Sequence, residues 1–420
     1  MDNRLPTPLT GNTLMVNVLS GDKRAQRLDP ITSLRFFAAA MIVVGHAHAI
    51  SGSWGIATAI PLEQGVSFFF VLSGFILTWN YPVLREWPAI RRFWRARFAR
   101  IWPLHAFTCF MWIALLYRPD LQTPSAAGKE AAKLILNLGL LHAWLPFSVL
   151  SFNFVSWSLS EEFFFYAMFP FLIARWRKHW ALLIGSSLAV VIAFILIVHF
   201  LGFAASETKI MGLLYFNPLV RIFEFVVGIA TAGIIRHISG RIHLTATQWT
   251  MLETATLATI IAVLLGLYAL PGAITALSPA AAYYVVHEGI SVLWAVLIGV
   301  FAVSTGLIAK ILSRRLFVLL GEASFALYLC HAMIINYVQV NHLQIAGVPG
   351  YLLLWGVCLS VSFALFYGIE QPARQWLLNV GQKDPADERK ERRPGPNFTI
   401  WTANIFLAVF IIAAVSHRTF

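Results

Sequence analysis

An apolar stretch near the N-terminus carries two side chains that could do chemistry. The stretch Leu34 to His48 reads LRFFAAAMIVVGHAH, and it contains Arg35 and His46. On a helix these two residues differ by only about 20° in direction and by about 16 Å along the axis. An ionisable side chain deep in a membrane is costly and usually faces a protein interior or a wet cavity. His46 is therefore a candidate general base, and the alternative is a histidine that only packs.

A basic and aromatic stretch, 91–102, precedes the third apolar run. Arg97 and Arg100 stand at i and i+3, so both guanidinium groups can converge on one anion such as a phosphate. The alternative is that the stretch lies on anionic lipid at the membrane surface. Pro103 is expected to open the following helix, because proline is tolerated in a first turn.

A pair of carboxylates begins the fourth apolar run, WSLSEEFFFYAMFP. Glu161 can serve simply to cap the helix start, and the sequence leaves its role open. Glu162 and Tyr166 stand at i and i+4 and share one face. A carboxyl group in apolar surroundings suits acid–base work or the orientation of a histidine, so Glu162 is a candidate catalytic residue.

Other predicted helices carry isolated polar groups. Arg221 and Glu224 stand at i and i+3, which predicts an ion pair sheltered from lipid. Ser73 and Gly74 lie inside the second apolar run, where small residues favour close helix packing. Further polar positions on apolar helices are Ser324, Tyr328, His331 and Glu370.

The composition identifies the class of protein. Of 420 residues, 59% are hydrophobic and 12% are charged, whereas soluble domains carry about 25% charged residues. The sequence therefore predicts an all-α polytopic membrane protein with about 10–11 transmembrane helices. The net charge of +12 lies in short basic blocks between apolar runs, so it does not indicate nucleic-acid binding. Three cysteines in apolar runs are predicted to be core thiols: Cys109, Cys330 and Cys358.

Eleven runs are near the length of about 20 residues that a helix needs to cross a bilayer. They are 31–50, 64–81, 101–117, 157–175, 181–203, 217–235, 249–270, 288–308, 316–338, 350–369 and 398–415. The short apolar segment 134–144 lies between two prolines and is interpreted as re-entrant or interfacial.

Lysine and arginine are distributed unevenly between the two sides of this topology. With the N-terminus inside, the outer side holds only Arg118, Lys129, Lys133, Lys209 and Arg418. This asymmetry predicts a cytoplasmic N-terminus. The expected organisation is a tail at 1–27, a membrane domain at 28–378, a cytoplasmic linker at 379–397 and one more transmembrane helix within 398–420.

The motifs in this order resemble the acyltransferase-3 family of integral membrane acyltransferases. Arg35 and His46 resemble its first-helix motif, and Arg97 and Arg100 resemble its RxxR motif. The other matching positions are FFFVLSGF at 68–75, Trp157 to Ser160 with Glu162 and Tyr166, Arg221 with Glu224, Ser324 with Tyr328 and His331, and Glu370 with Pro372. The resemblance covers about residues 27–378 and is to members without an extracytoplasmic hydrolase-like domain.

The resemblance implies transfer of an acyl group, usually acetyl, from cytoplasmic acyl-CoA to a hydroxyl of an envelope or exported carbohydrate. It implies a multi-pass protein of a bacterial inner membrane. His46 would be the general base or a transient acyl carrier, and Glu162 would tune it. The expected residues for acyl-CoA and substrate are Arg35, Ser73, Arg97, Arg100, Tyr166, Tyr328 and His331.

Two other classes of function fit the same pattern. A transporter or permease also buries ionisable residues along its substrate path. A lipid-binding scaffold would use the arginines only as a membrane anchor. No metal is expected, because His46 and His48 stand at i and i+2 and point to different faces. Acetyl-CoA is expected as a donor substrate and not as a resident cofactor, and the bilayer as the surrounding partner.

Overall fold

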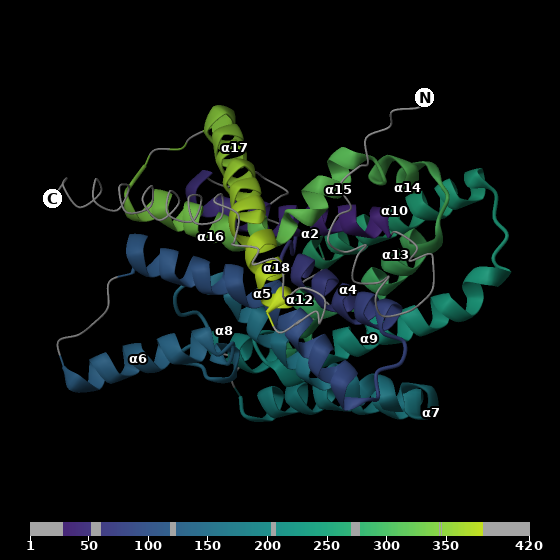
Figure 1. Ribbon diagram of the computed structural model, residues 1–420, viewed down its shortest axis with the longest axis horizontal. Helices are drawn as coiled ribbons and strands as arrows, with labels where there is room; N and C mark the ends of the chain where they lie inside the picture. The colour runs from purple at the N-terminus through teal and green to yellow at the C-terminus, as the bar shows by residue number, and fades with distance from the viewer. Residues whose placement is uncertain are drawn as a thin grey trace, which may run out of the picture.

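A computed structural model describes residues 28–51, 60–117, 123–202, 207–269, 278–343, 345 and 347–380. These ranges form a bundle of α-helices and contain no strand. Most helices run along the long axis of the molecule, and α17 stands steeply across them (Figure 1). The predicted N-terminal tail, the linker beyond 380 and the span at 398–415 lie outside the described residues.

The longer helices of the bundle match some of the predicted runs and depart from others. They are α2 (Asp29–Ser51), α4 (Gln64–Asn80), α5 (Trp87–Leu115), α6 (Pro124–Leu138), α7 (Trp157–Phe200), α9 (Pro218–Ile238), α10 (Ala246–Ala269), α12 (Pro279–Glu288), α13 (Ser291–Val303), α15 (Arg315–Glu322), α16 (Ser324–Val340), α17 (Gly347–Leu365) and α18 (Gln371–Asn379). The shorter ones are η1 (His142–Trp144), η2 (Phe154–Ser156), α8 (Glu207–Ile210), η4 (Met211–Tyr215), η5 (Ser239–Arg241), α14 (Leu307–Leu312) and η6 (Phe366–Glu370).

Among the described residues, seven helical segments are long and apolar enough to cross a membrane, or eight if the bent pair α15 and α16 counts as one span. The protein is therefore an all-α polytopic membrane protein, as predicted. Helix α4 is apolar but has only 17 residues. Helix α6 and the segment after it are not among the candidate spans.

Helix α7 combines two predicted spans in one element. Its backbone leaves helical geometry at His179, which divides it into two halves of about 20 residues. Trp157 at its start packs on Tyr215, and His199 near its end contacts Ser278 at 3.2 Å. Tyr215 belongs to η4, and η4 packs against α12, the helix that follows Ser278. Both ends of α7 therefore lie near the same two elements, which means that the chain reverses its direction at His179.

The predicted boundary at Pro103 was wrong. Helix α5 begins at Trp87, and Pro103 lies inside it. The basic stretch 91–102 is thus part of the same helix as the apolar run and does not form a separate surface helix. The helix continues because Arg100 reaches a buried carboxylate on another helix, so its charge can be placed inside the bundle.

Two predicted single spans are broken. The run 288–308 is interrupted after Glu288, so α12 and α13 together make the crossing. The run 316–338 is bent by 57° between α15 and α16. Both breaks directly follow a glutamate, Glu288 or Glu322, but one charged residue changes the mean hydropathy of a long apolar run little, so hydropathy alone did not reveal either break.

Small residues set the closest approach in the bundle, between α4 and α9. A methyl group at Gly74 would overlap the backbone carbonyl of Phe225, and one at Gly228 would overlap the carbonyl of Val71. The reciprocal contact holds the two backbones together, as small residues do in membrane helix pairs. This confirms the packing interpretation of Gly74.

Several helices begin with the same capping pattern. Thr123, Asn217 and Ser278 each accept a backbone N–H in the first turn of α6, α9 and α12, and proline follows each of them. The side chain satisfies a donor that has no helical partner, and proline needs none. Polar caps therefore fix where α9 and α12 enter the bundle.

Candidate functional site

His46 and His331 meet inside the bundle. Nδ1 of His46 lies 2.9 Å from Nε2 of His331, and the two ring planes differ by 6°. His331 is fully buried and His46 is partly buried. An apolar seam brings α2 and α16 together, in which Ala39, Val43 and Ala47 pack near Leu327 and Ile335. The structure thus joins two of the predicted site residues directly.

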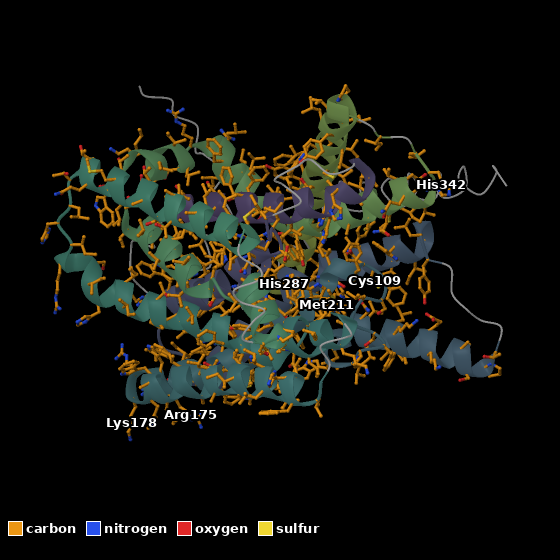
Figure 2. The ribbon with its side chains drawn as sticks, turned by 180° about the vertical axis from the view of Figure 1, so that it is seen from behind. Cys109, Arg175, Lys178, Met211, His287 and His342 are labelled. Carbon is orange, nitrogen blue, oxygen red and sulfur yellow. The ribbon has the colours of Figure 1, made fainter. Side chains whose placement is uncertain are left out.

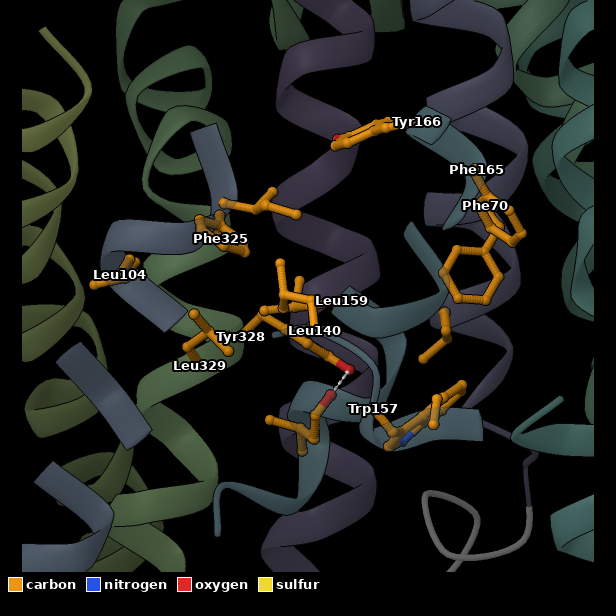
Figure 3. Close-up of a cluster of buried hydrophobic side chains, with 14 of the residues drawn as sticks. Phe70, Leu104, Leu140, Trp157, Leu159, Phe165, Tyr166, Phe325, Tyr328 and Leu329 are labelled. Atoms are coloured by element: carbon orange, nitrogen blue, oxygen red, sulfur yellow. Dashed lines mark hydrogen bonds between the residues drawn. The ribbon is translucent and has the colours of Figure 1, made fainter. Parts of the chain in front are cut away.

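A short segment before α7 covers this pair. Phe154 in η2 packs its ring edge-on against His46, with centroids 5.2 Å apart. Tyr328 donates a hydrogen bond of 2.7 Å to the carbonyl of Val155 (Figure 3). It shares another of 2.8 Å with Ser158. Asn153 donates to the carbonyl of Leu329. The hydroxyl of Tyr328 therefore fixes η2 against α16 and holds Phe154 beside the histidines.

Four arginines and two carboxylates gather on the face of α2 that carries Arg35. This arginine cluster consists of Arg35, Arg97, Arg100, Arg374, Glu162 and Glu370. Formally the four cations exceed the two anions by two charges. Such an excess, largely shielded from solvent, favours binding of an anion. On α2 the cluster lies about 16 Å from the level of His46.

Within the arginine cluster, Arg100 already has a protein partner. It forms an ion pair with Glu370, whose side chain is 1% exposed. Arg97 lies against the rings of Tyr81 and Phe93, and its Nε is buried with no hydrogen-bond partner among the described residues. The prediction that Arg97 and Arg100 converge on one anion therefore fits Arg97 better than Arg100.

Arg374 was missed by the sequence interpretation. It is buried, and it lies within electrostatic range of Arg97, Arg100 and Glu370. Its position four residues after Glu370 would have placed both side chains on one helix face. That spacing is the signal that could have identified it.

Glu162 belongs to the arginine side of the site. Tyr166 donates a hydrogen bond to Glu162, and Ser73 donates to the same oxygen at 3.5 Å. The charge of Glu162 also acts on Arg35. Among the described residues, the hydrogen-bonded contact that orients His46 comes from His331 and not from Glu162. The expectation that Glu162 tunes His46 is thus not supported by a direct contact between the two side chains in the described ranges.

A second buried charge group surrounds Arg221. Its Nη1 lies 3.3 Å from Glu224 and 3.1 Å from Glu288, so the predicted ion pair with Glu224 is confirmed and gains a second carboxylate. Glu161 is fully buried within range of the same arginine, and neither of its oxygens has a hydrogen-bond partner in the described ranges. The sequence left the role of Glu161 open between helix capping and another function, and the structure places its carboxylate in the buried charge group around Arg221.

The arrangement combines an imidazole that can accept a proton with a separate anion-binding cluster. Both line the same face of α2, one nearer each end. All three cysteines are buried and unpaired, as predicted. The described ranges contain no group of three histidine, cysteine, aspartate or glutamate side chains that could hold a metal ion.

Comparisons with known proteins find acyltransferases. The sequence profile described as "Acyltransferase domain" matches residues 30–370. The chain is 31% identical over 361 residues to the acyltransferase MdmB of Streptomyces mycarofaciens, which covers 81% of this chain and 87% of the relative. No solved structure matches the chain.

Proposed function

Because the chain belongs to the acyltransferase-3 family and is thus an acyl-transferring membrane enzyme, we propose that its donor is cytoplasmic acetyl-CoA and its acceptor a hydroxyl of an envelope or exported carbohydrate. The reaction forms an O-acetyl ester and releases the CoA thiol. The observation that supports this proposal most is that His46 on α2 contacts His331 on α16. The same face of α2 carries Arg35, which belongs to the arginine cluster with excess positive charge.

The donor would bind with its phosphates at the arginine cluster. Guanidinium groups suit bidentate phosphate contacts, and Arg97 has a buried nitrogen still available for one. Arg35 and Arg374 would add charge from two other helices, and Arg100 would keep Glu370 as its partner. The pantetheine arm of CoA would then run along α2 toward His46, over the distance of about 16 Å that separates the two levels.

His46 would act as the general base. It would take the proton of the acceptor hydroxyl while that oxygen attacks the thioester carbonyl carbon. The C–S bond then breaks, and the leaving sulfur receives the proton from His46. A transient acyl-His46 is the second form of this mechanism, and label on the protein after a short incubation that is lost in mild acid or with neutral hydroxylamine would identify it.

The protein is a multi-pass membrane protein, and its location in a bacterial inner membrane with the N-terminus inside is part of the proposal. Arg175 and Lys178 lie at one end of the bundle, and His342 lies at the other (Figure 2). The positive-inside rule assigns the end with Arg175 and Lys178 to the cytoplasm. Cysteines introduced at Lys178 and at Asn341 should therefore react oppositely with an impermeant reagent in intact cells.

The test of the function uses inverted membrane vesicles from cells that make the protein, supplied with acetyl-CoA labelled in the acetyl group. We expect label in carbohydrate that mild base releases, together with free CoA thiol. His46→Ala should abolish both signals, and His48→Ala should retain them because the exposed His48 bonds the carbonyl of Gly45 and lies off the His46–His331 contact. Uptake of a solute without thiol release would instead indicate a transporter, and lipid dependence without turnover would indicate a scaffold.

A further inference from the structure

The contact between His46 and His331 is aligned for a hydrogen bond in the plane of both rings. The ring centroids are 5.2 Å apart, while the two nitrogens are 2.9 Å apart. For that contact distance, this centroid separation is close to the largest that two imidazole rings permit. Both nitrogens therefore lie near the line between the ring centres, where the N–H bond and the lone pair of an imidazole point.

The other nitrogen of His331 decides the direction of this hydrogen bond. Nδ1 of His331 lies 3.2 Å from the carbonyl of Leu327, one turn earlier in α16. A carbonyl oxygen can only accept, so this Nδ1 carries the hydrogen. A neutral imidazole has a single N–H, and Nε2 of His331 therefore holds a lone pair.

The proton positions on His46 follow from those on His331. Since Nε2 of His331 accepts, Nδ1 of His46 must donate, and Nε2 of His46 is left with the lone pair. The opposite arrangement would need a doubly protonated His331, which is fully buried and has no acidic side chain in hydrogen-bond contact among the described residues. A buried charge without a partner is costly.

We propose that His331 is a positioning residue that holds His46 with its proton on Nδ1, so that Nε2 of His46 is the atom that receives the acceptor proton. This inference rests on the proposed function of His46 as general base. Hydrogen bonds thus link the carbonyl of Leu327 to His331 and His331 to His46. In serine hydrolases a carboxylate orients the catalytic histidine, and here the imidazole of His331 takes that position.

The step balances without a further reactant. Nε2 of His46 takes the proton from the acceptor hydroxyl, the C–O bond forms, the C–S bond breaks, and the same proton passes from Nε2 to the sulfur. While His46 is doubly protonated, its Nδ1 hydrogen stays bound to the lone pair on Nε2 of His331. His331 therefore supports both protonation states of His46 without itself changing state.

The first test observes the protons directly. In purified protein with ¹⁵N-labelled histidine, both His46 and His331 should carry hydrogen on Nδ1 and a lone pair on Nε2. The signal of His46 is identified by its loss in His46→Ala, and that of His331 by its loss in His331→Leu. His331→Leu should leave the His46 signal in place and change it to the form with hydrogen on Nε2, or to a mixture of the two. A wild-type His46 that carries its hydrogen on Nε2 would overturn the proposal, whatever the activity of the enzyme.

The second test compares two substitutions at His331 by steady-state kinetics with acetyl-CoA. His331→Leu removes the acceptor and should lower kcat by about 100-fold with little change in KM for acetyl-CoA. His331→Gln places an amide oxygen near the position of Nε2 and should keep kcat within about tenfold of wild type. His105→Leu is the control, because His105 is equally buried and bonds the carbonyl of Asn137 instead.

The outcomes separate this inference from the function it rests on. Unchanged kcat in folded His331→Leu, or His331→Gln as impaired as His331→Leu, would contradict the positioning role. Retained acyl transfer in His46→Ala would contradict the proposed base, yet the nitrogen signals would still report whether His331 sets the protonation of His46.

Discussion

Arg100 on α5 and Glu370 on η6 form an ion pair between residues 270 positions apart in the sequence. The side chain of Glu370 is 1% exposed and that of Arg100 is 16% exposed, so the pair lies at the edge of the buried region. It joins the helix that carries the RxxR pattern to η6, which leads directly into α18. The pair therefore sets the position of α18 and of Arg374, which lies on that helix.

The pair should contribute to stability in a way that depends on both partners. Removing one charge leaves the other buried alone, which costs roughly 3–5 kcal/mol for a fully buried pair and less here because Arg100 is partly exposed. Arg100→Met and Glu370→Leu should each lower the thermal unfolding temperature in detergent. The double variant should lose less than the sum of the two single losses, and additive losses would show that the pair is not coupled.

The arginine cluster predicts that arginines inside it contribute to donor binding and that an exposed arginine on α5 does not. Arg97→Ala and Arg374→Ala should each weaken acetyl-CoA binding about tenfold, or about 1.4 kcal/mol, because each removes a cation from the cluster. Arg92→Ala is the matched control, since Arg92 is on the same helix but exposed. The measurement is the Kd of acetyl-CoA for purified variants. Equal affinities in all three would leave only the lipid-anchor interpretation of α5.

The fold was largely predictable because a bilayer imposes a length on every crossing. Runs of about 20 apolar residues marked α2, α9 and α10 closely. The start of α5 was not predictable, because its basic first half enters the bundle only through a partner distant in sequence. The break at Gly289 also depends on surrounding packing, which apolar composition does not encode.

The sequence predicted which site residues share a face of one helix, but it did not predict which residues on different helices contact each other. Helix periodicity placed Arg35 with His46 and Glu162 with Tyr166, because those relationships depend only on spacing. The contact between His46 and His331 joins positions 285 apart, and no local pattern specifies it. For the same reason the sequence assigned Glu162 to the histidine, whereas the structure groups it with the arginines.

Arg221 should be one of the side chains on which folding depends most. Three buried carboxylates, Glu161, Glu224 and Glu288, lie around it, and all four side chains are fully buried. Arg221→Met would leave three acidic groups without a cation, so we expect a loss of several kcal/mol and little folded protein in the membrane. The measurement is the yield of monodisperse protein, with the exposed Arg241 as the control position. A normal yield of Arg221→Met would show that the carboxylates satisfy one another.

Glu162 gives the prediction that best separates the two halves of the site. Its carboxylate acts on Arg35 and accepts hydrogen bonds from Tyr166 and Ser73. Within the arginine cluster it offsets one positive charge, so Glu162→Gln raises the excess from two to three. Acetyl-CoA should therefore bind a few-fold more tightly to this variant, while turnover falls because the tighter ground state does not help the reaction.

Titration calorimetry with acetyl-CoA measures the first effect, and thiol release measures the second. Tyr166→Phe is the companion variant, because it removes a hydrogen bond to Glu162 but no charge, and its Kd should stay near wild type. If Glu162→Gln instead binds acetyl-CoA normally and loses turnover to the same extent as His46→Ala, Glu162 acts on the reacting atoms, and the grouping with the arginines is not its functional role.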